Sequence, residues 1–93
     1  MNFATNETLI RAKIGERRCF YSMRIHEALR HNGRTATVVA YELKVSLSAV
    51  SATILGKNHS ARILDALRAA GVPEKYLFDP RYPERWAEKE TAA

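Results

Sequence analysis

A short neutral segment lies at the centre of an otherwise basic chain. Residues 43–58, LKVSLSAVSATILGKN, hold no charge between Lys44 and Lys57. Small hydroxyl and apolar side chains in this segment could face a ligand, namely Leu47, Ser48, Ala49, Ser51 and Ala52. A serine hydroxyl both donates and accepts hydrogen bonds, while alanine and leucine can contact the methyl group of thymine. This mixture suits contact with base edges in the DNA major groove, which is about 12 Å wide.

Basic and polar residues flank this segment on both sides. Lysine and arginine side chains bind phosphate oxygens, and such contacts position a protein on DNA without reading its sequence. Hydroxyl and amide groups can make the same kind of contact. We therefore expect contacts to the DNA backbone from Arg34, Thr35, Thr37, Lys44, Lys57, Asn58, His59 and Arg62.

The charge of the chain is unevenly distributed. The formal net charge over 93 residues is +5. Residues 1–62 hold ten Lys and Arg against four Asp and Glu, whereas residues 63–93 hold five against six. A basic body favours a polyanionic partner, and nucleic acid is the commonest one for a small domain. The alternative is a basic surface that serves solubility alone.

Other kinds of site lack the residues that they need. The three histidines match no common metal-ligand spacing and have no clustered cysteines or carboxylates beside them. Arg17 and Arg18 could favour a thiolate at the single cysteine, Cys19, but no base or oxyanion site accompanies it. We therefore expect no enzyme activity, no metal, no cofactor and no small-molecule substrate.

The N-terminal third is expected to form an arm and one helix. Residues 1–17 predict an arm, in which residues 8–14 could form a short strand or a loose segment. Gly15 then ends the pattern of these residues. Arg17 and Arg18 would then be solvated or would contact DNA, as basic arms do. Residues 18–32 have helical spacing, with apolar side chains from Phe20, Met23, Ile25, Ala28 and Leu29 along one side.

Each of the next three expected helices has a hydroxyl residue at its start. Thr35 would cap the first of them, and either Ser46 or Ser48 the second. Ser60 would cap the third. These residues divide the middle of the chain into short helices with short connections.

The first two of these helices share a predicted core and a tight turn. Residues 44–47 form the turn, and Lys44 occupies a position where glycine is common. A lysine there must adopt positive φ or a different turn, at a cost of about 1 kcal/mol. The shared core would consist of Val39, Ala40, Leu43, Val45, Val50 and Ile54. Two short helices joined in this way have the layout of a helix-turn-helix unit.

The C-terminal part is expected to close the bundle. Residues 74–77 predict a turn of helix, and Leu77 and Phe78 would cover the core. The aromatic residues Tyr76, Phe78, Tyr82 and Trp86 are expected to pack rather than to stack on bases, because the local charge is near neutral. The fold class is therefore all-α, with four to five short helices in a helix-turn-helix bundle.

Positions from the first helix to the C-terminal part follow the pattern of one known family. They are Phe20, Ile25, His26, Ala28, Leu29, Val39, Ala40, Val50, Ser51 and Ile54, together with the ending LFDPRY. In these residues the chain resembles the Ner-type regulators of Mu-like phages, a branch of the lambda-repressor-like helix-turn-helix proteins. The resemblance implies a lambda-repressor-like fold and a small phage or prophage repressor. Lys44 in place of glycine, and the first 19 residues, depart from the family pattern.

The sequence thus predicts a helix-turn-helix domain at residues 18–83, between the arm at 1–17 and a tail at 84–93. The domain would be a sequence-specific regulator of transcription that reads the major groove of double-stranded DNA with its third helix, at residues 48–55. Because one small module gives little specificity, a homodimer on a pseudo-palindromic operator is expected. The alternative is a protein-interaction module, such as an antitoxin-like or regulator-binding bundle. Without a signal peptide or an apolar run that could span a membrane, the cytoplasm is the expected compartment.

Overall fold

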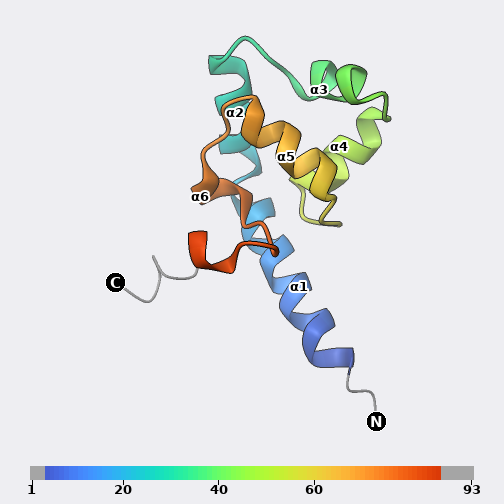
Figure 1. Ribbon diagram of the computed structural model, residues 1–93, viewed down its shortest axis with the longest axis vertical. Coiled ribbons are helices and arrows are strands. Elements are labelled where there is room, and N and C mark those ends of the chain that lie inside the picture. The colour runs from blue at the N-terminus through green and yellow to red at the C-terminus, as the bar shows by residue number, and fades with distance from the viewer. Residues whose placement is uncertain (1–3, 87–93) are drawn as a thin grey trace.

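The computed structural model describes the backbone of residues 4–86 and the side chains of residues 10–86. Within this range the chain is helical and contains no strand (Figure 1). The helices are α1 (Ala4–Phe20), α2 (Ser22–His31), α3 (Ala36–Leu43), α4 (Leu47–Ile54), α5 (Ala61–Ala69), α6 (Glu74–Leu77) and the 3₁₀ helix η1 (Pro83–Arg85). The predicted all-α class is confirmed, although the described range holds six α-helices instead of four or five. None of them is both long and apolar enough to cross a bilayer.

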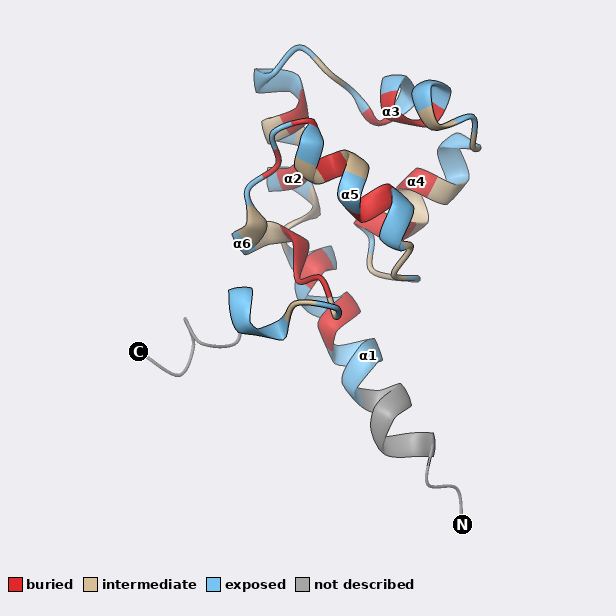
Figure 2. Ribbon diagram, in the orientation of Figure 1, coloured by how far each residue is buried: buried red, intermediate tan, exposed pale blue. Residues whose placement is uncertain are grey.

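One core joins α2 through α6 (Figure 2). Its buried apolar side chains are Ile25, Leu29, Ala36, Val39, Ala40, Val50, Ile54, Ile63, Leu64, Leu67, Ala70, Val72 and Leu77. The core predicted between α3 and α4 is confirmed for its four most buried members, while Leu43 and Val45 are half-buried against it. Helical periodicity identified these positions because each of these helices buries one continuous face.

The first 20 residues differ from the prediction. Instead of an arm with a possible strand, α1 runs without interruption from Ala4 to Phe20 and crosses the predicted domain boundary at residue 17. Its first half extends away from the other helices (Figure 1). Gly15 does not end the helix; it lies where the helix meets the turn after α4, and a Cβ atom on it would overlap the carbonyl group of Gly56. The glycine therefore serves close backbone packing. Residues 1–3 of the predicted arm and 87–93 of the predicted tail lie outside the described range.

The helix expected at residues 18–32 is divided between α1 and α2. Tyr21 lies between them with φ −102° and ψ 16°, and its ring stacks on Phe78 with a centroid distance of 5.7 Å. This break turns Phe20 and Met23 outward, so their side chains are 79% and 76% exposed instead of facing the core. Ile25 and Leu29 are buried as predicted.

Hydroxyl caps begin the three middle helices. Thr35 Oγ1 accepts a hydrogen bond from the amide of Val38 at 3.2 Å, and Ser46 Oγ accepts from that of Ala49 at 3.0 Å. Ser60 Oγ accepts from the amide of Ile63 at 3.3 Å. Of the two serines considered for α4, Ser46 is the cap, and Ser48 lies inside the helix.

Lys44 ends α3 in the left-handed conformation, with φ 61° and ψ 43°. The amide of Val45 then donates to the carbonyl of Ala40 at 3.0 Å, which closes the turn tightly before α4. Of the two alternatives expected for Lys44, positive φ or a different turn, the structure shows positive φ.

The substitution Lys44→Gly should raise the free energy of unfolding by up to about 1 kcal/mol, because glycine adopts this φ without the steric cost of a Cβ atom. Chemical denaturation followed by circular dichroism measures the change. The matched control is Phe78→Gly at the other non-glycine residue with positive φ among those described, 45°. Because the Phe78 side chain is buried, this variant should be destabilised. A destabilised Lys44→Gly protein would contradict the prediction.

Candidate nucleic-acid interface

Helix α4 presents a short, uncharged face to solvent. Leu47 and Ser48 are exposed, while Ala49, Ser51 and Ala52 are half-buried. All five residues predicted to read bases therefore lie on one helix, with Ser48 the most accessible of its two serines. Leu55, directly after α4, extends the same surface and is 39% exposed. The sequence reasoning missed Leu55, although its place seven residues after Ser48 puts the two on one helix face.

Exposed cations lie at the two ends of this face. Lys44 precedes α4 and Lys57 follows it, and neither forms an ion pair with any residue of the described range. Arg62 also follows α4 in the chain, and its Nη2 donates to the carbonyl of Leu43 at 2.6 Å. That bond ties α5 to the end of α3 and fixes the position of the guanidinium. The Arg62 guanidinium thus lies near Lys44 before the start of α4, and Lys57 follows its end.

Helix α3 contributes the remaining polar residues and one exposed aromatic ring. Thr37 is exposed in the first turn of α3, while the Thr35 hydroxyl oxygen is engaged in the helix cap. The guanidinium of Arg34 forms an ion pair with Glu42, so its charge is partly neutralised. Tyr41 is 84% exposed and was missed by the sequence reasoning. Its position on the side of the helix opposite the apolar stripe of Val39, Ala40 and Leu43 could have indicated that it faces outward.

The sequence predicts that Asn58 and His59 contact DNA phosphates, and in the structure both side chains form hydrogen bonds within the fold. Asn58 Oδ1 accepts hydrogen bonds from the Thr53 hydroxyl at 2.5 Å and from the Ser60 amide at 3.4 Å. Both ring nitrogens of His59 are engaged, Nδ1 with Arg18 and Nε2 with the carbonyl of Arg11 at 3.0 Å. These partners leave the imidazole no free nitrogen for a phosphate. The Asn58 bonds engage its oxygen and not the amide nitrogen, which is the group that would donate to a phosphate.

Arg18 is buried, which the sequence did not predict. Its side chain is 0% exposed and donates to the carbonyls of Thr53 at 2.9 Å, Leu77 at 3.1 Å and Asn58 at 3.2 Å. Burial lowers the pKa of Arg18 to about 10 in spite of the attraction of Asp79, so the guanidinium is still charged at neutral pH. Because a charged guanidinium only donates, His59 Nδ1 must accept and Nε2 must carry the proton.

The environment of His59 favours its neutral form. Burial lowers the pKa of His59 below its ordinary 6.5, and the positive charge of Arg18 lowers it further. A neutral imidazole is the form that can accept from Arg18 and donate to the carbonyl of Arg11 at once. The loop after α4 is thereby joined to α1 by a chain of hydrogen bonds.

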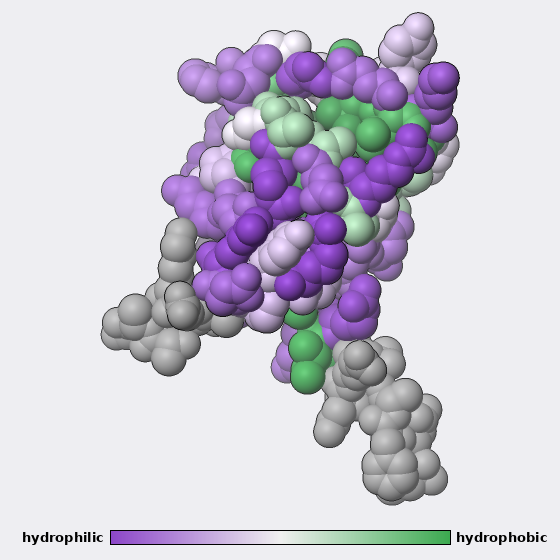
Figure 3. Space-filling view, in the orientation of Figure 1, coloured by the Kyte–Doolittle hydropathy of each residue, from purple (hydrophilic) through white to green (hydrophobic). Residues whose placement is uncertain are grey.

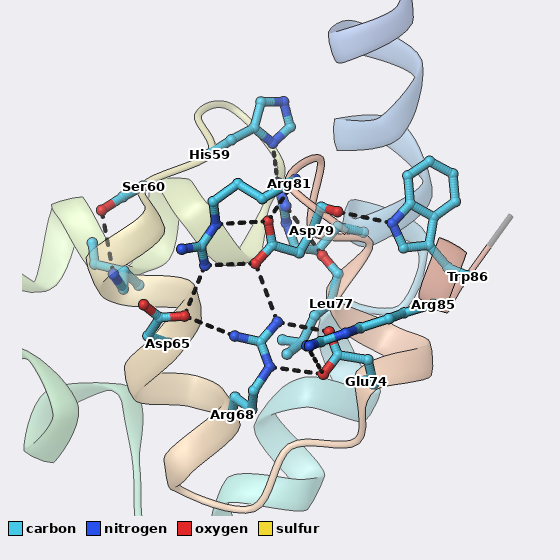
Figure 4. Close-up of polar contacts among 12 residues, drawn as sticks. His59, Ser60, Asp65, Arg68, Glu74, Leu77, Asp79, Arg81, Arg85 and Trp86 are labelled. Carbon is cyan, nitrogen blue, oxygen red and sulfur yellow. Dashed lines mark hydrogen bonds and ion pairs between the residues drawn. The ribbon is translucent and has the colours of Figure 1, made fainter. Parts of the chain in front are cut away.

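The C-terminal arginines form ion pairs with acidic side chains (Figure 4), and the guanidinium of Arg85 also lies over the ring of Tyr82. The buried carboxylate of Asp79 pairs with Arg81 at 2.7 Å and with Arg68 at 3.1 Å. The Arg68 and Arg85 guanidinium groups also pair with Glu74. These contacts hold the segment after α6 against α5, and they remove the arginines from the candidate interface.

Aromatic residues near the C-terminus pack on one another as predicted. The ring of Tyr21 lies 5.5 Å from that of Tyr76, and Phe78 lies 5.8 Å from Trp86. Trp86 Nε1 donates to the carbonyl of Asp79 at 2.9 Å. Tyr82 instead has the guanidinium of Arg85 over its ring, 4.0 Å from the centroid.

Acid should destabilise the fold as Asp79 becomes protonated. Burial opposes its ionisation, but hydrogen bonds from Arg81 and Arg68 outweigh burial and lower the pKa of Asp79 from 3.8 to about 2. The unfolded state therefore binds a proton at higher pH than the folded state. The resulting stabilisation of about 2 kcal/mol is complete above the ordinary pKa and is lost as the pH falls through the folded-state value. Urea unfolding at a series of pH values measures this loss.

The variant Asp79→Asn distinguishes the contribution of Asp79 to the acid-induced loss of stability from that of other acidic groups. It should be less stable than the wild type at neutral pH, and the two stability curves should converge in strong acid, where wild-type Asp79 is also neutral. Curves that stay parallel across the whole acid range would show that other carboxylates cause the loss.

The chain matches no family model, no curated protein and no solved structure in comparisons with known proteins.

Proposed function

We propose that the chain is a sequence-specific regulator of transcription that binds double-stranded DNA with α4 in the major groove. The observation that carries this proposal is the uncharged exposed face of α4 between the exposed cations Lys44 and Lys57. A helix with its side chains is about 10–12 Å across, similar to the width of the groove. Short side chains let such a helix approach the bases closely, while the cations at its ends meet phosphates.

The arrangement of α3, the turn and α4 supports a helix-turn-helix unit of the lambda-repressor-like type. The two helices pack directly on each other, with the small Ala40 5% exposed in their shared core. Lys44 in the left-handed conformation supplies the sharp turn at the position where the family carries glycine. In this geometry α3 would lie across the DNA backbone with Thr37 near a phosphate. The resemblance to Ner-type regulators makes a phage or prophage repressor, acting in the cytoplasm, the proposed identity.

A homodimer on a pseudo-palindromic operator is part of the proposal. One module with few base-reading side chains buries too little surface to select one site in a genome. Two copies related by a two-fold axis would read two half-sites about one helical turn apart. Few polar contacts to bases also mean that the sequence-dependent shape of the DNA would contribute to specificity.

A selection experiment tests the proposed function and identifies the operator at the same time. The full chain is incubated with a random pool of duplexes, and the enriched duplex is compared with a scrambled one by fluorescence anisotropy at several salt concentrations. We expect tighter binding to the enriched duplex and a slope of log K against log salt of about −0.9 per phosphate contact. No enrichment, or equal and weak binding to both duplexes, would overturn the proposal.

A protein-interaction module is the second candidate, and exposed apolar surface favours it. Val38 and Tyr41 on α3 are 37% and 84% exposed, and Leu47 on α4 is 48% exposed. Apolar surface is visible in the region of α3, bordered by hydrophilic side chains (Figure 3). A protein partner on this face would bind with little dependence on salt, whereas phosphate contacts make affinity fall steeply. The salt series therefore separates the two candidates.

A further inference from the structure

A groove lies along the contact between α1 and the loop that follows α4. Arg11, Glu16 and Cys19 line it from α1, and Leu55 and Lys57 line it from the other side. The proposed use of α4 already includes Lys57 on one wall of this groove, but it does not involve α1, which forms the other wall.

The exposed face of α4 continues into the groove. Leu55 belongs to the face that carries Ser48 and also lines the groove. A duplex that contacted Ser48 along α4 would therefore pass next to the groove at the C-terminal end of the helix. At that end of α4, the DNA strand that borders the major groove would present its phosphates to α1.

The charges of the groove suit a phosphate. Arg11 and Lys57 lie on opposite walls, both exposed, and neither pairs with an acidic side chain of the described residues. Glu16 is the one acidic residue among those that line the groove, and it too forms no ion pair within the described residues. Two unpaired cations that face each other across a groove attract an anion more strongly than either does alone.

Hydrogen bonds and close backbone packing hold the two walls in a fixed position. His59 donates to the carbonyl of Arg11, and the buried Arg18 holds His59 from the other side of its ring. The backbones of Gly15 and Gly56 meet directly a turn further along α1. Arg11 is therefore placed by the folded structure, and little backbone freedom is lost when a ligand binds.

We infer that this groove binds the phosphate backbone of double-stranded DNA next to the segment that α4 contacts, with Arg11 and Lys57 on either side of the strand. The inference rests on the proposed function. It makes α1 a second DNA-binding element, so that the contact extends beyond the α3–α4 pair on one flank. Such contacts add affinity for any sequence and do not discriminate between bases.

The variant Arg11→Ala tests the groove, because the proposed function already places Lys57 at a phosphate. On the enriched duplex, its slope of log K against log salt should be shallower than that of the wild type by about 1, because one phosphate contact contributes about 0.9. Affinity for the enriched and scrambled duplexes should fall by the same factor, so their ratio stays constant. A hydroxyl-radical footprint should lose protection on one flank and keep it at the centre.

The matched control is Lys13→Ala, which removes the same charge from an exposed position that does not line the groove. Lys13 lies on the same helix as Arg11, so the control also corrects for a general effect of charge on α1. Its slope and footprint should match those of the wild type. Thermal melting establishes that both variants are folded, and Arg11→Gln replaces the alanine variant if that protein does not fold.

The outcomes distinguish this inference from the proposed function. If the wild type enriches no duplex, both are overturned. If it enriches one, and the groove variant keeps the wild-type slope and footprint, the groove inference alone is overturned and α4 remains the proposed DNA contact. A loss of slope that is equal in the groove variant and the control would likewise overturn the groove assignment, because it would show a general effect of net charge.

Discussion

Replacing Arg18 with alanine should lower the free energy of unfolding by about 3–5 kcal/mol, because each buried carbonyl left without a donor costs about 1–3 kcal/mol. The variant would leave the carbonyls of Thr53 and Leu77 without their donor and would empty the volume that the side chain fills. It would also remove the partner of His59 Nδ1. Urea denaturation followed by circular dichroism measures the loss.

Arg17→Ala is the matched control for this prediction. Arg17 is adjacent, basic and exposed, and its guanidinium lies 5.2 Å from the centroid of the Phe78 ring. A cation–π contact at an exposed site contributes about 0.5–1 kcal/mol, so the control should lose much less stability. Arg18→Lys keeps the charge but lacks the planar fork that reaches several carbonyls, and it should recover only part of the loss. Equal effects at positions 17 and 18 would contradict the structural role of Arg18.

Ser48→Glu should weaken binding to the enriched duplex by about 100-fold or more, because like charges brought together in an interface cost several kcal/mol. Ser48 is exposed in the first turn of α4, where a carboxylate is favourable for the helix itself. The melting temperature should therefore stay close to that of the wild type. Anisotropy titration and thermal melting of the same preparation measure the two effects separately.

Two controls sharpen the Ser48 experiment. Ser48→Gln adds similar volume without charge and should weaken binding less. Met23→Glu places the same acid at an exposed position in the first turn of α2, which is not part of the candidate interface. Judged from the sequence alone, Ser51→Glu would test the α4 face as well as Ser48→Glu does. In the structure Ser51 is half-buried, so a glutamate there would disturb packing as well as binding. Unchanged affinity in Ser48→Glu would remove α4 from the DNA-binding surface.

The parts of the fold that the sequence predicted depend on local interactions. A cap joins residues three apart, as Thr35 joins Val38 and Ser46 joins Ala49. An amphipathic helix repeats its apolar residues every three or four positions, which identified Val50 and Ile54 as core. The α4 face followed from the same periodicity, since short side chains between two lysines are visible in the sequence itself.

The parts that the sequence did not predict depend on contacts between distant residues. Arg18 finds its acceptors 35 and 59 residues away, and nothing near it in the sequence indicates that its charge is buried. From the sequence, Gly15 indicates a break after the possible strand at residues 8–14, yet in the structure it packs against Gly56. His59 was assigned to DNA from its type and place, while the carbonyl and guanidinium that engage it come from α1.

The buried guanidinium of Arg18 also determines when the chain can finish folding during synthesis. Its acceptors belong to the end of α4, the loop after α4 and the end of α6, so they emerge from the ribosome at widely separated times. Until Leu77 has been made, burial of Arg18 would leave one of its donors unsatisfied. We therefore expect helix α1, although it is synthesised first, to reach its final position only after Leu77 has left the ribosome.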